Sequence, residues 1–176
     1  MDNEQQMVNR ILERFPYLEG QISVHGSKRI SSLPLTAKNF HEVFNYAITE
    51  EGFSTLNSII GLDNGDQMFF VYALSDSANT VFLIKLAVPA KEPAIKSVCS
   101  IFPGALFFEK ELADMLGAII ENIPDKHVYS LPAGWPEGSN PLKKSWDPAF
   151  FDKNSLNYYG PSEHKKSQRT GGVQHE

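Results

Sequence analysis

Three stretches of the chain repeat apolar residues three and four positions apart, which is the spacing of one face of an α-helix. The first covers residues 7–15, and the second covers residues 40–48 behind Thr36, whose hydroxyl can cap a helix N-terminus. The third covers residues 104–116 and is followed by Gly117, the residue type that most often ends a helix. The pattern therefore predicts three amphipathic helices.

The remaining apolar residues mostly alternate with polar ones, which is the period of β-strands. A hairpin is predicted for residues 56–62 and 67–74, joined by an Asp-Asn-Gly-Asp turn. Two short strands are expected within residues 21–35, and two further strands at residues 81–88 and 95–102. The four strands from the hairpin onward are expected to form the body of the sheet. This order of elements predicts an α+β fold, a single domain with a mostly antiparallel sheet covered by the helices.

The protein is expected to divide into an N-terminal helix (1–19), the α+β domain (20–140) and an extended C-terminal tail (141–176). The tail has no hydrophobic period, and its residues 162–176 are polar enough to be disordered when free. Aromatic residues such as Trp146 interrupt the tail. These rings either dock on a partner or fold back on the parent domain, and the sequence leaves both outcomes open.

Composition and charge narrow the class of protein. With 41% apolar and 21% charged residues in a chain of 176, the protein has the make-up of one ordinary globular domain. No run approaches the roughly 20 apolar residues that span a bilayer, and the N-terminus has no basic region before an apolar one. Residues 1–140 carry 10 basic and 17 acidic side chains, whereas residues 141–176 carry 6 and 4. An acidic body argues against binding to a nucleic-acid duplex.

No arrangement of residues is typical of a catalytic, cofactor-binding or metal site. The single cysteine, Cys99, cannot supply the several thiolates of an iron–sulfur cluster, and it falls inside the predicted strand 95–102, where a buried and inert thiol is expected. The five histidines include no pair three or four residues apart. Gly61, Gly65 and Gly104 are interpreted as scattered turn glycines rather than as a phosphate-binding loop.

Charged side chains gather on the third predicted helix, at Glu109, Lys110, Glu111 and Asp114. Glu111 and Asp114 share a helix face, which makes them candidates for general acid–base chemistry in a small carboxylate-dependent enzyme. Lys110 is expected to pair with Asp114, four residues further on. The favoured interpretation is a charged helix surface that faces solvent or a partner.

Residues 105–144 carry four short motifs, which are Ala-Leu-Phe-Phe-Glu-Lys-Glu-Leu-Ala-Asp-Met-Leu-Gly over residues 105–117, Pro124-Asp125, Leu131-Pro132 with Trp135-Pro136, and Pro141-Leu142-Lys143-Lys144. Together they resemble the thirty-kilodalton subunit family of respiratory complex I (the C-type subunit of NADH:quinone oxidoreductase), including its counterparts in energy-converting nickel–iron hydrogenases and formate hydrogenlyases. The resemblance extends over residues 20–147. Lys110 stands where the family usually has arginine, and Ile123 stands where it usually has histidine.

The resemblance implies a cofactor-free structural and assembly subunit of a membrane-associated oxidoreductase, either an NADH dehydrogenase or an energy-converting hydrogenase. It implies docking on a large hydrogenase-like subunit of the forty-nine-kilodalton type, beside a small iron–sulfur subunit. Iron–sulfur clusters, flavin or nickel–iron are then expected only in those partners, and the protein is expected to be cytoplasmic and peripheral on the inner face of the cell membrane. The alternatives are a free-standing adaptor and the small carboxylate-dependent enzyme. The residues predicted at the partner interface are Glu109, Lys110, Glu111, Asp114, Pro141, Leu142, Lys143, Lys144 and Trp146.

Overall fold

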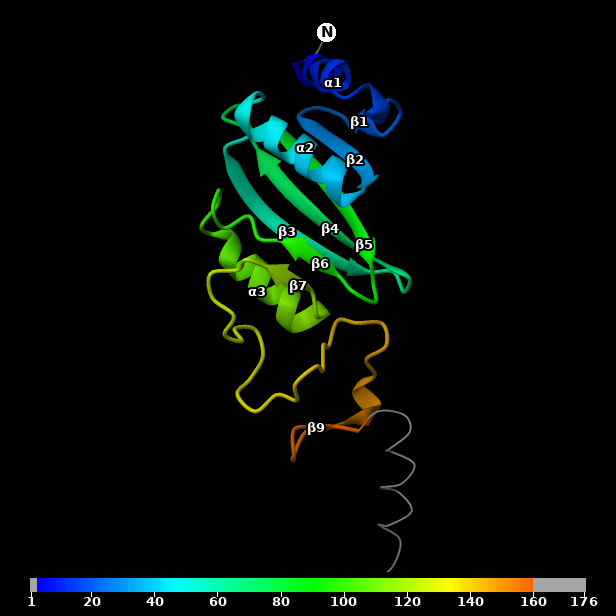
Figure 1. The fold of residues 1–176 in the computed structure, drawn as a ribbon, viewed down its shortest axis with the longest axis vertical. Coiled ribbons are helices and arrows are strands. Elements are labelled where there is room, and N and C mark those ends of the chain that lie inside the picture. Colours follow the sequence, from blue (N-terminus) through cyan, green and yellow to red (C-terminus); the bar gives the residue numbers. More distant parts are fainter. Residues whose placement is uncertain (1–2, 160–176) are drawn as a thin grey trace, which may run out of the picture.

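A five-stranded sheet in the order β1-β2-β5-β4-β3 forms the centre of the protein (Figure 1). The computed structural model describes residues 3–159. The strands of the sheet are β1 (Ile22–Val24), β2 (Arg29–Leu35), β3 (Thr55–Asp63), β4 (Gln67–Ser75) and β5 (Val81–Pro89). The helices are α1 (Asn3–Arg14), α2 (Ala37–Thr49) and α3 (Ala105–Leu116). The shorter elements are η1 (Pro16–Leu18), β6 (Ala94–Lys96), β7 (Ile119–Glu121), η2 (Pro148–Phe150), β8 (Phe151–Asp152) and β9 (Asn157–Tyr158).

The predicted α+β class and mostly antiparallel sheet are confirmed. Only the β2–β5 pair is parallel in this sheet, and the other three neighbouring pairs are antiparallel. Thr36 caps α2 as predicted, because its Oγ1 accepts a hydrogen bond from the backbone N–H of Asn39 at 3.3 Å. Gly117 ends α3 in the left-handed conformation with φ of +68°, which costs glycine little because it has no Cβ. Among the described residues, no helix is long and apolar enough to cross a lipid bilayer.

The predicted strand at residues 95–102 is wrong. Only β6 is extended there, and it pairs in parallel with β7 outside the main sheet. The backbone then turns, and the N–H of Val98 donates to the carboxylate of Glu109 at 2.6 Å instead of to a neighbouring strand. A side chain has thus taken over a hydrogen bond that a strand ladder would otherwise supply. The sheet is completed by β1 and β2, on the far side of β5.

The helices cover one face of the sheet. Alternate residues of β4 and β5 point into the core, and Phe70 and Tyr72 of β4 are almost fully buried. The ring of Tyr72 lies 4.7 Å from that of Phe40 on α2, which crosses in front of the sheet (Figure 1). On the same face Gly61 of β3, which lies opposite Phe70, faces the side chains of α3. Helices α2 and α3 therefore pack against the same face of the sheet.

Helix α1 joins this core rather than standing apart from it. Met7 and Ile11 are buried and belong to the same hydrophobic cluster as the sheet. Arg10 links α1 to Glu51, which follows the end of α2. Its Nη2 lies 2.6 Å from Oε2 of Glu51 and its Nε lies 2.9 Å from Oε1. The Glu51 side chain is only 2% exposed, so the two-pronged guanidinium contact compensates for burial of its charge.

Gly61 is a contact residue of the sheet and not a turn glycine, which corrects its interpretation from the sequence. It lies within β3, where a Cβ would come within 2.3 Å of Leu116 Cδ1 and 2.6 Å of Leu112 Cδ2. Helix α3 can therefore approach β3 this closely only because residue 61 has no side chain.

We expect the substitution Gly61→Val to lower the free energy of unfolding by about 2 kcal/mol, because overpacking forces α3 away from the sheet. The matched control is Ile60→Val, whose side chain points to the opposite face and is 50% exposed. That change should cost less than about 0.5 kcal/mol. Urea unfolding followed by circular dichroism measures both, and equal losses for the two variants would contradict the close approach of α3.

Candidate docking surface at helix α3

Glu109 lies inside the protein, which corrects the prediction that it belongs to a charged helix surface. The residue is 0% exposed. Its Oε1 accepts the hydrogen bond from Val98, while Oε2 accepts hydrogen bonds from the Ser97 hydroxyl at 2.7 Å and the Cys99 thiol at 3.1 Å. Burial raises the pKa of Cys99, which keeps the thiol protonated as a donor. Three donors thus compensate for burial of the carboxyl group, and Glu109 fastens the turn after β6 to α3 instead of contacting a partner.

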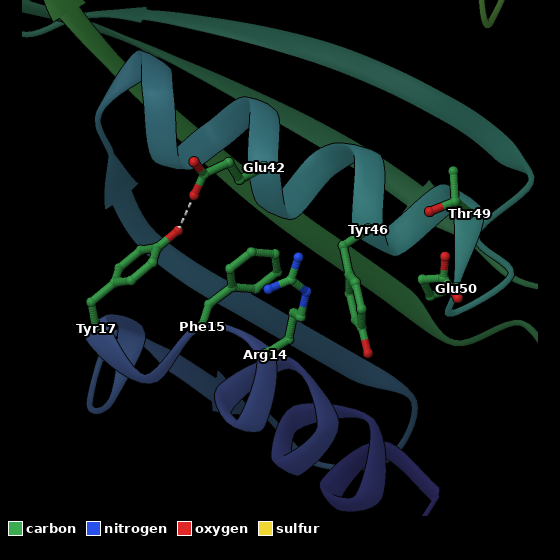
Figure 2. A pocket seen from close by; sticks show the side chains of 7 residues that line it. All are labelled: Arg14, Phe15, Tyr17, Glu42, Tyr46, Thr49 and Glu50. Carbon is green, nitrogen blue, oxygen red and sulfur yellow. Dashed lines mark hydrogen bonds between the residues drawn. The ribbon is translucent and has the colours of Figure 1, made fainter.

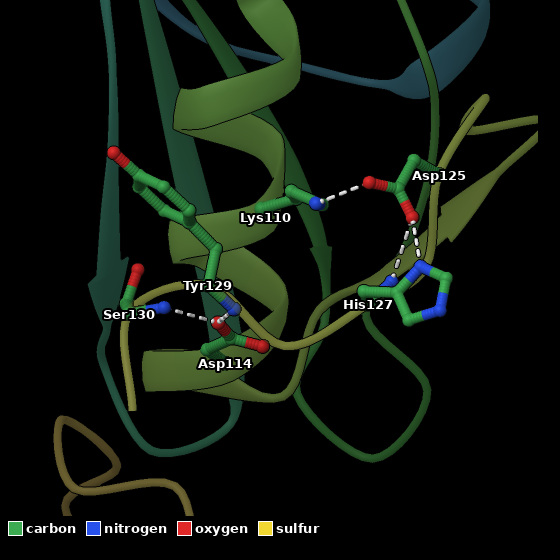
Figure 3. Close-up of polar contacts among 6 residues, drawn as sticks. All are labelled: Lys110, Asp114, Asp125, His127, Tyr129 and Ser130. Carbon is green, nitrogen blue, oxygen red and sulfur yellow. Dashed lines mark hydrogen bonds and ion pairs between the residues drawn. The ribbon is translucent and has the colours of Figure 1, made fainter. Parts of the chain in front are cut away.

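Lys110 pairs with Asp125, and not with Asp114 as predicted (Figure 3). Its Nζ lies 2.6 Å from Oδ2 of Asp125, and its side chain is only 10% exposed. The other carboxylate oxygen, Oδ1, accepts the backbone N–H of His127 at 3.0 Å and lies 2.6 Å from the His127 Nδ1. The hydrogen bond from Lys110, followed by those from His127, holds the pKa of Asp125 well below its usual range.

Asp114 binds the same loop further along (Figure 3). Its Oδ2 accepts hydrogen bonds from the backbone N–H groups of Tyr129 at 2.8 Å and Ser130 at 2.7 Å. Lys110 and Asp114 are one turn of α3 apart, and together they hold the irregular loop 122–131 against the helix. The predicted helical ion pair fails because each of these side chains has a partner from the loop.

The carboxylates of Glu111 and Asp114 do not form an acid–base pair. Asp114 lines two hollows of about 420 and 240 Å³, and Glu111 lines neither of them. Glu111 is exposed on the outer side of α3, whereas Asp114 is occupied by two backbone N–H groups. General acid–base chemistry needs both groups within reach of one substrate, so this arrangement gives no support to the carboxylate-dependent enzyme.

The outer side of α3 carries an apolar surface with one carboxylate, which we call the α3 face: Phe107, Glu111, Val128 and Tyr129. The three apolar residues are 54%, 63% and 59% exposed, respectively. The rings of Phe107 and Tyr129 are in contact, with centroids 5.2 Å apart. Glu111 follows Phe107 by one helical turn and therefore lies beside it. Clustered exposed aromatic residues of this kind are typical of protein interfaces.

The polypeptide leaves the domain along the C-terminal end of α3, through residues 140–144, which we call the exit segment. The Asn140 side-chain amide donates to the carbonyls of Ala113 at 3.3 Å and Asp114 at 2.9 Å. The backbone N–H of Leu142 donates to a third carbonyl of the helix at 2.9 Å. A helix leaves its last carbonyls without partners, and the exit segment satisfies those of Asp114 and Met115 and adds a second donor to that of Ala113, which already accepts the N–H of Gly117.

Two further contacts hold the exit segment in place. A Cβ on Gly117 would lie 2.5 Å from Asn140 Oδ1 and 2.8 Å from Lys143 Nζ, so any larger residue there would displace these side chains of the exit segment, in addition to the strain at its φ angle. The backbone N–H of Lys144 donates to Oδ2 of Asp63 at 2.9 Å, at the end of β3. The predicted interface residues 141–144 therefore lie next to α3 and to the β3–β4 hairpin.

Aromatic residues of the tail pack against one another and against Trp135 of the domain. The rings of Trp135 and Trp146 lie 4.8 Å and 6.2 Å from that of Phe151. Both indole N–H groups donate to Ser139, to its carbonyl at 2.7 Å and to its hydroxyl at 2.9 Å. In the structure these rings fold back on one another and on Ser139, and docking of Trp146 on a partner stays a prediction. The predicted disorder of residues 162–176 lies outside the described residues.

A further hollow of about 630 Å³ lies between the end of α1 and α2 (Figure 2). Tyr17 donates its hydroxyl hydrogen to Oε2 of Glu42 at 2.6 Å, and burial together with this hydrogen bond raises the pKa of Tyr17 to about 12. The Arg14 guanidinium lies over the Phe15 ring at 5.5 Å. These polar groups serve contacts within the protein and join the α1 segment to α2.

Among residues 3–159, no three His, Cys, Asp or Glu side chains gather closely enough to hold a metal ion. The residues that sequence reasoning missed are Asp125, Ser139 and Asn140, all of them in irregular loops. Asp125 could have been found, because it belongs to the Pro-Asp motif of the resemblance. Ser139 and Asn140 gave no signal, since a single polar residue in a loop has no period.

The sequence of this chain is similar to a known protein family and to individual relatives. A family model described as "Respiratory-chain NADH dehydrogenase, 30 Kd subunit" matches residues 33–150, a range that includes the α3 face and the exit segment. The membrane-bound hydrogenase subunit beta of Pyrococcus furiosus is 27% identical over 149 residues, which are 81% of this chain and 86% of that protein.

Two longer relatives match over part of their length. The C/D subunit of NADH-quinone oxidoreductase from Rhodopseudomonas palustris (strain BisB5) is 35% identical over 74 residues, 42% of this chain and 12% of that protein. Formate hydrogenlyase subunit 5 of Escherichia coli is 28% identical over 139 residues, 75% of this chain and 24% of that protein. This chain therefore spans less than a quarter of either longer relative.

Two solved structures have a similar fold. The Nqo5 trypsin-resistant fragment has a TM-score of 0.56 and 26% identity, covering 67% of this chain and 98% of that one. A polypeptide of the archaeal membrane-bound sulfane sulfur reductase has a TM-score of 0.68 over 99% of this chain and 96% of its own. Its identity is 20%, so that likeness concerns the fold alone.

We expect Glu109→Ala to lower the free energy of unfolding by about 3 kcal/mol, because it leaves buried donors without an acceptor. The control Glu111→Ala removes an exposed carboxylate two residues away and should cost less than about 0.5 kcal/mol. Chemical denaturation of both variants measures the difference. If Glu109→Ala were as stable as Glu111→Ala, the buried carboxylate would not hold the turn.

We expect the Lys110–Asp125 contact to stabilise the protein at neutral pH and to weaken in acid. The pKa of Asp125 is depressed in the folded state, so the unfolded protein binds this proton more readily. The stabilisation is therefore present above the ordinary Asp pKa of about 4 and is lost as the pH falls towards the folded value. The stability difference between wild type and Asp125→Asn should be constant above about pH 5 and shrink below it. A difference that grew on acidification would contradict this sign.

Proposed function

The chain belongs to the family of the respiratory-chain NADH dehydrogenase 30 Kd subunit, and we propose that it is a cofactor-free structural and assembly subunit of a membrane-associated, complex I-like oxidoreductase. The observation that carries the proposal is the family match over residues 33–150. The relatives named above support it, because each is a subunit of an oxidoreductase or hydrogenase assembly.

The α3 face and the exit segment are the proposed docking surface for a large hydrogenase-like subunit. Glu111, Leu142 and Lys144 are exposed there and can reach a partner directly. Lys110 and Asp114 contribute indirectly, because they bind the loop 122–131, which carries Val128 and Tyr129. Aromatic anchors surrounded by charges of both signs suit an interface whose core is apolar and whose rim sets the register.

Redox chemistry is assigned to neighbouring subunits in this proposal. The sequence has one cysteine, whereas iron–sulfur clusters require several thiolates. Cys99 is buried and engaged with Glu109, which suits a structural thiol. Clusters, flavin or nickel–iron would then reside in the large subunit and in a small iron–sulfur subunit. The protein itself would be peripheral, on the inner face of the cell membrane.

Of the two kinds of assembly, the relatives favour the energy-converting hydrogenase. The match with the membrane-bound hydrogenase subunit beta covers 81% of this chain, whereas that with the C/D subunit of NADH-quinone oxidoreductase covers 42%. Affinity purification from the native host distinguishes the two, because the large subunit either retains nickel-binding cysteines or lacks them.

We expect Phe107→Glu to reduce the amount of large subunit that copurifies with this protein at least tenfold. The change buries a charge in the core of the proposed interface, and a tenfold loss corresponds to about 1.4 kcal/mol of binding free energy. The control Lys38→Glu alters an exposed residue of α2. Quantitative mass spectrometry of the purified assembly gives the readout. Equal recovery from both variants would remove the α3 face from the proposal.

The role of the tail needs a separate variant, because shortening the protein near Pro141 would also remove hydrogen bonds to α3. A variant that ends after Tyr159 keeps the described contacts and lacks only residues 160–176. Weaker recovery of the large subunit supports docking by these residues. Unchanged recovery would limit the docking surface to the α3 face and the exit segment.

A further inference from the structure

The face of the sheet that points away from the helices is apolar, although no described helix covers it. The pairing registers identify its members, since residues directly opposite each other on neighbouring strands point to the same face. Val71 lies opposite Ile60 on one side and Lys85 on the other. We call the central part of this surface the bare sheet face, and its members are Ile60, Leu62, Phe69, Val71, Ala73, Leu83, Lys85 and Ala87.

This composition is unusual for a sheet face that meets water. An antiparallel sheet with one solvated face ordinarily alternates apolar residues inside with polar residues outside. Here the central residues of β4 and β5 are apolar on both faces apart from Lys85, and β3 adds Ile60 and Leu62, which are 50% and 53% exposed. Polar residues on this face, Ser58, Gln67 and Ser75, lie towards the strand ends. Contiguous apolar surface of this kind marks a contact with another molecule. The pattern resembles that of a sheet covered on both sides.

Polar groups border the bare sheet face at two of its edges. On the β2 side, His25 Nε2 lies 2.7 Å from Ser31 Oγ and 3.0 Å from Ser23 Oγ. At the end of β4, Ser75 donates its hydroxyl hydrogen to Asn57 Oδ1 at 3.3 Å. An apolar centre with a hydrogen-bonding rim is the ordinary anatomy of a protein interface.

Lys85 indicates what kind of partner fits. It is the only charged residue of the bare sheet face, and it forms no ion pair with any carboxylate of residues 3–159. Burying an unpaired ammonium group is costly, so a partner that covers Lys85 must bring a carboxylate. A second copy of this protein would bring another Lys85 and no carboxylate, which disfavours a symmetric dimer through this face.

We infer that the bare sheet face binds an amphipathic helix of another protein subunit, with its apolar stripe on β3, β4 and β5 and an Asp or Glu paired with Lys85. A helix is the element that covers the other face of the same sheet, and an amphipathic helix presents the continuous apolar stripe that an apolar sheet face can bury. The inference rests on the proposed function only in taking partner subunits to exist.

This interface would be separate from the α3 face, because α3 packs on the opposite face of the sheet through Gly61. The α3 face and the bare sheet face therefore lie on opposite sides of the sheet. A subunit with both surfaces occupied would bridge two partners, which is an assembly role that the α3 face alone does not provide.

A cysteine-protection experiment tests coverage of the bare sheet face. In the full-length variant Leu62→Cys, the new thiol is exposed, whereas Cys99 is buried and has a raised pKa. We expect maleimide labelling at position 62 to be at least tenfold slower in the purified assembly than in the isolated protein. The control Lys38→Cys, on the exposed side of α2, should label equally fast in both samples.

A zero-length cross-link identifies the occupant. Carbodiimide activates a carboxylate and joins it to a lysine amine in contact, with loss of water, so Lys85 should yield an amide with an Asp or Glu of another subunit. The matched control is Lys85→Arg, which keeps the charge but forms no such amide. Mass spectrometry should place the carboxylate in a segment with apolar residues three and four positions apart.

The outcomes separate the two proposals. Recovery of this protein without any partner subunit would overturn both of them. An assembly in which position 62 is labelled as fast as in the isolated protein would overturn the second interface and leave the proposed function intact. A cross-link from Lys85 to a second copy of this protein, or none at all, would overturn the helical partner.

Discussion

The buried carboxyl group of Glu109 is the contact on which the position of α3 depends. A carboxyl group at 0% exposure is tolerated only where donors surround it, and here Ser97, Val98 and Cys99 supply them. These donors lie on consecutive residues, so the turn after β6 and the helix can meet in only one register. The interaction therefore sets how α3 lies on β3 and which of its sides faces outward.

The outward side of α3 then organises a region that has almost no regular structure. Side chains of the helix bind the loop 122–131, and the exit segment satisfies the carbonyls at the helix end. An irregular loop has no ladder of its own and would be mobile without such contacts. Held in this way, it presents Val128 and Tyr129 beside Phe107. The helix thus fixes the position of the proposed docking surface, and the loop contributes Val128 and Tyr129 to it.

The two faces of the sheet suggest a division of roles. One face packs against α2 and α3 and gives the domain its core, and the other remains apolar without a cover from the described residues. If both proposals hold, the domain is a spacer whose folded core separates two partners. The Cys99 thiol and the Lys110 ammonium group both serve contacts within the domain, to Glu109 and Asp125 respectively.

The sequence by itself determined the elements whose cause is local. Helix spacing, the Thr36 cap, the Gly117 stop and the hairpin turn each depend on residues a few positions apart, and all of them formed as predicted. Only the tertiary structure decided what depends on distant partners, such as burial of Glu109, the choice of Asp125 by Lys110 and the parallel pairing of β2 with β5. The physical reason is that a charged residue on a helix looks the same in sequence whether it meets water or a buried donor, because its surroundings come from segments far away in the sequence.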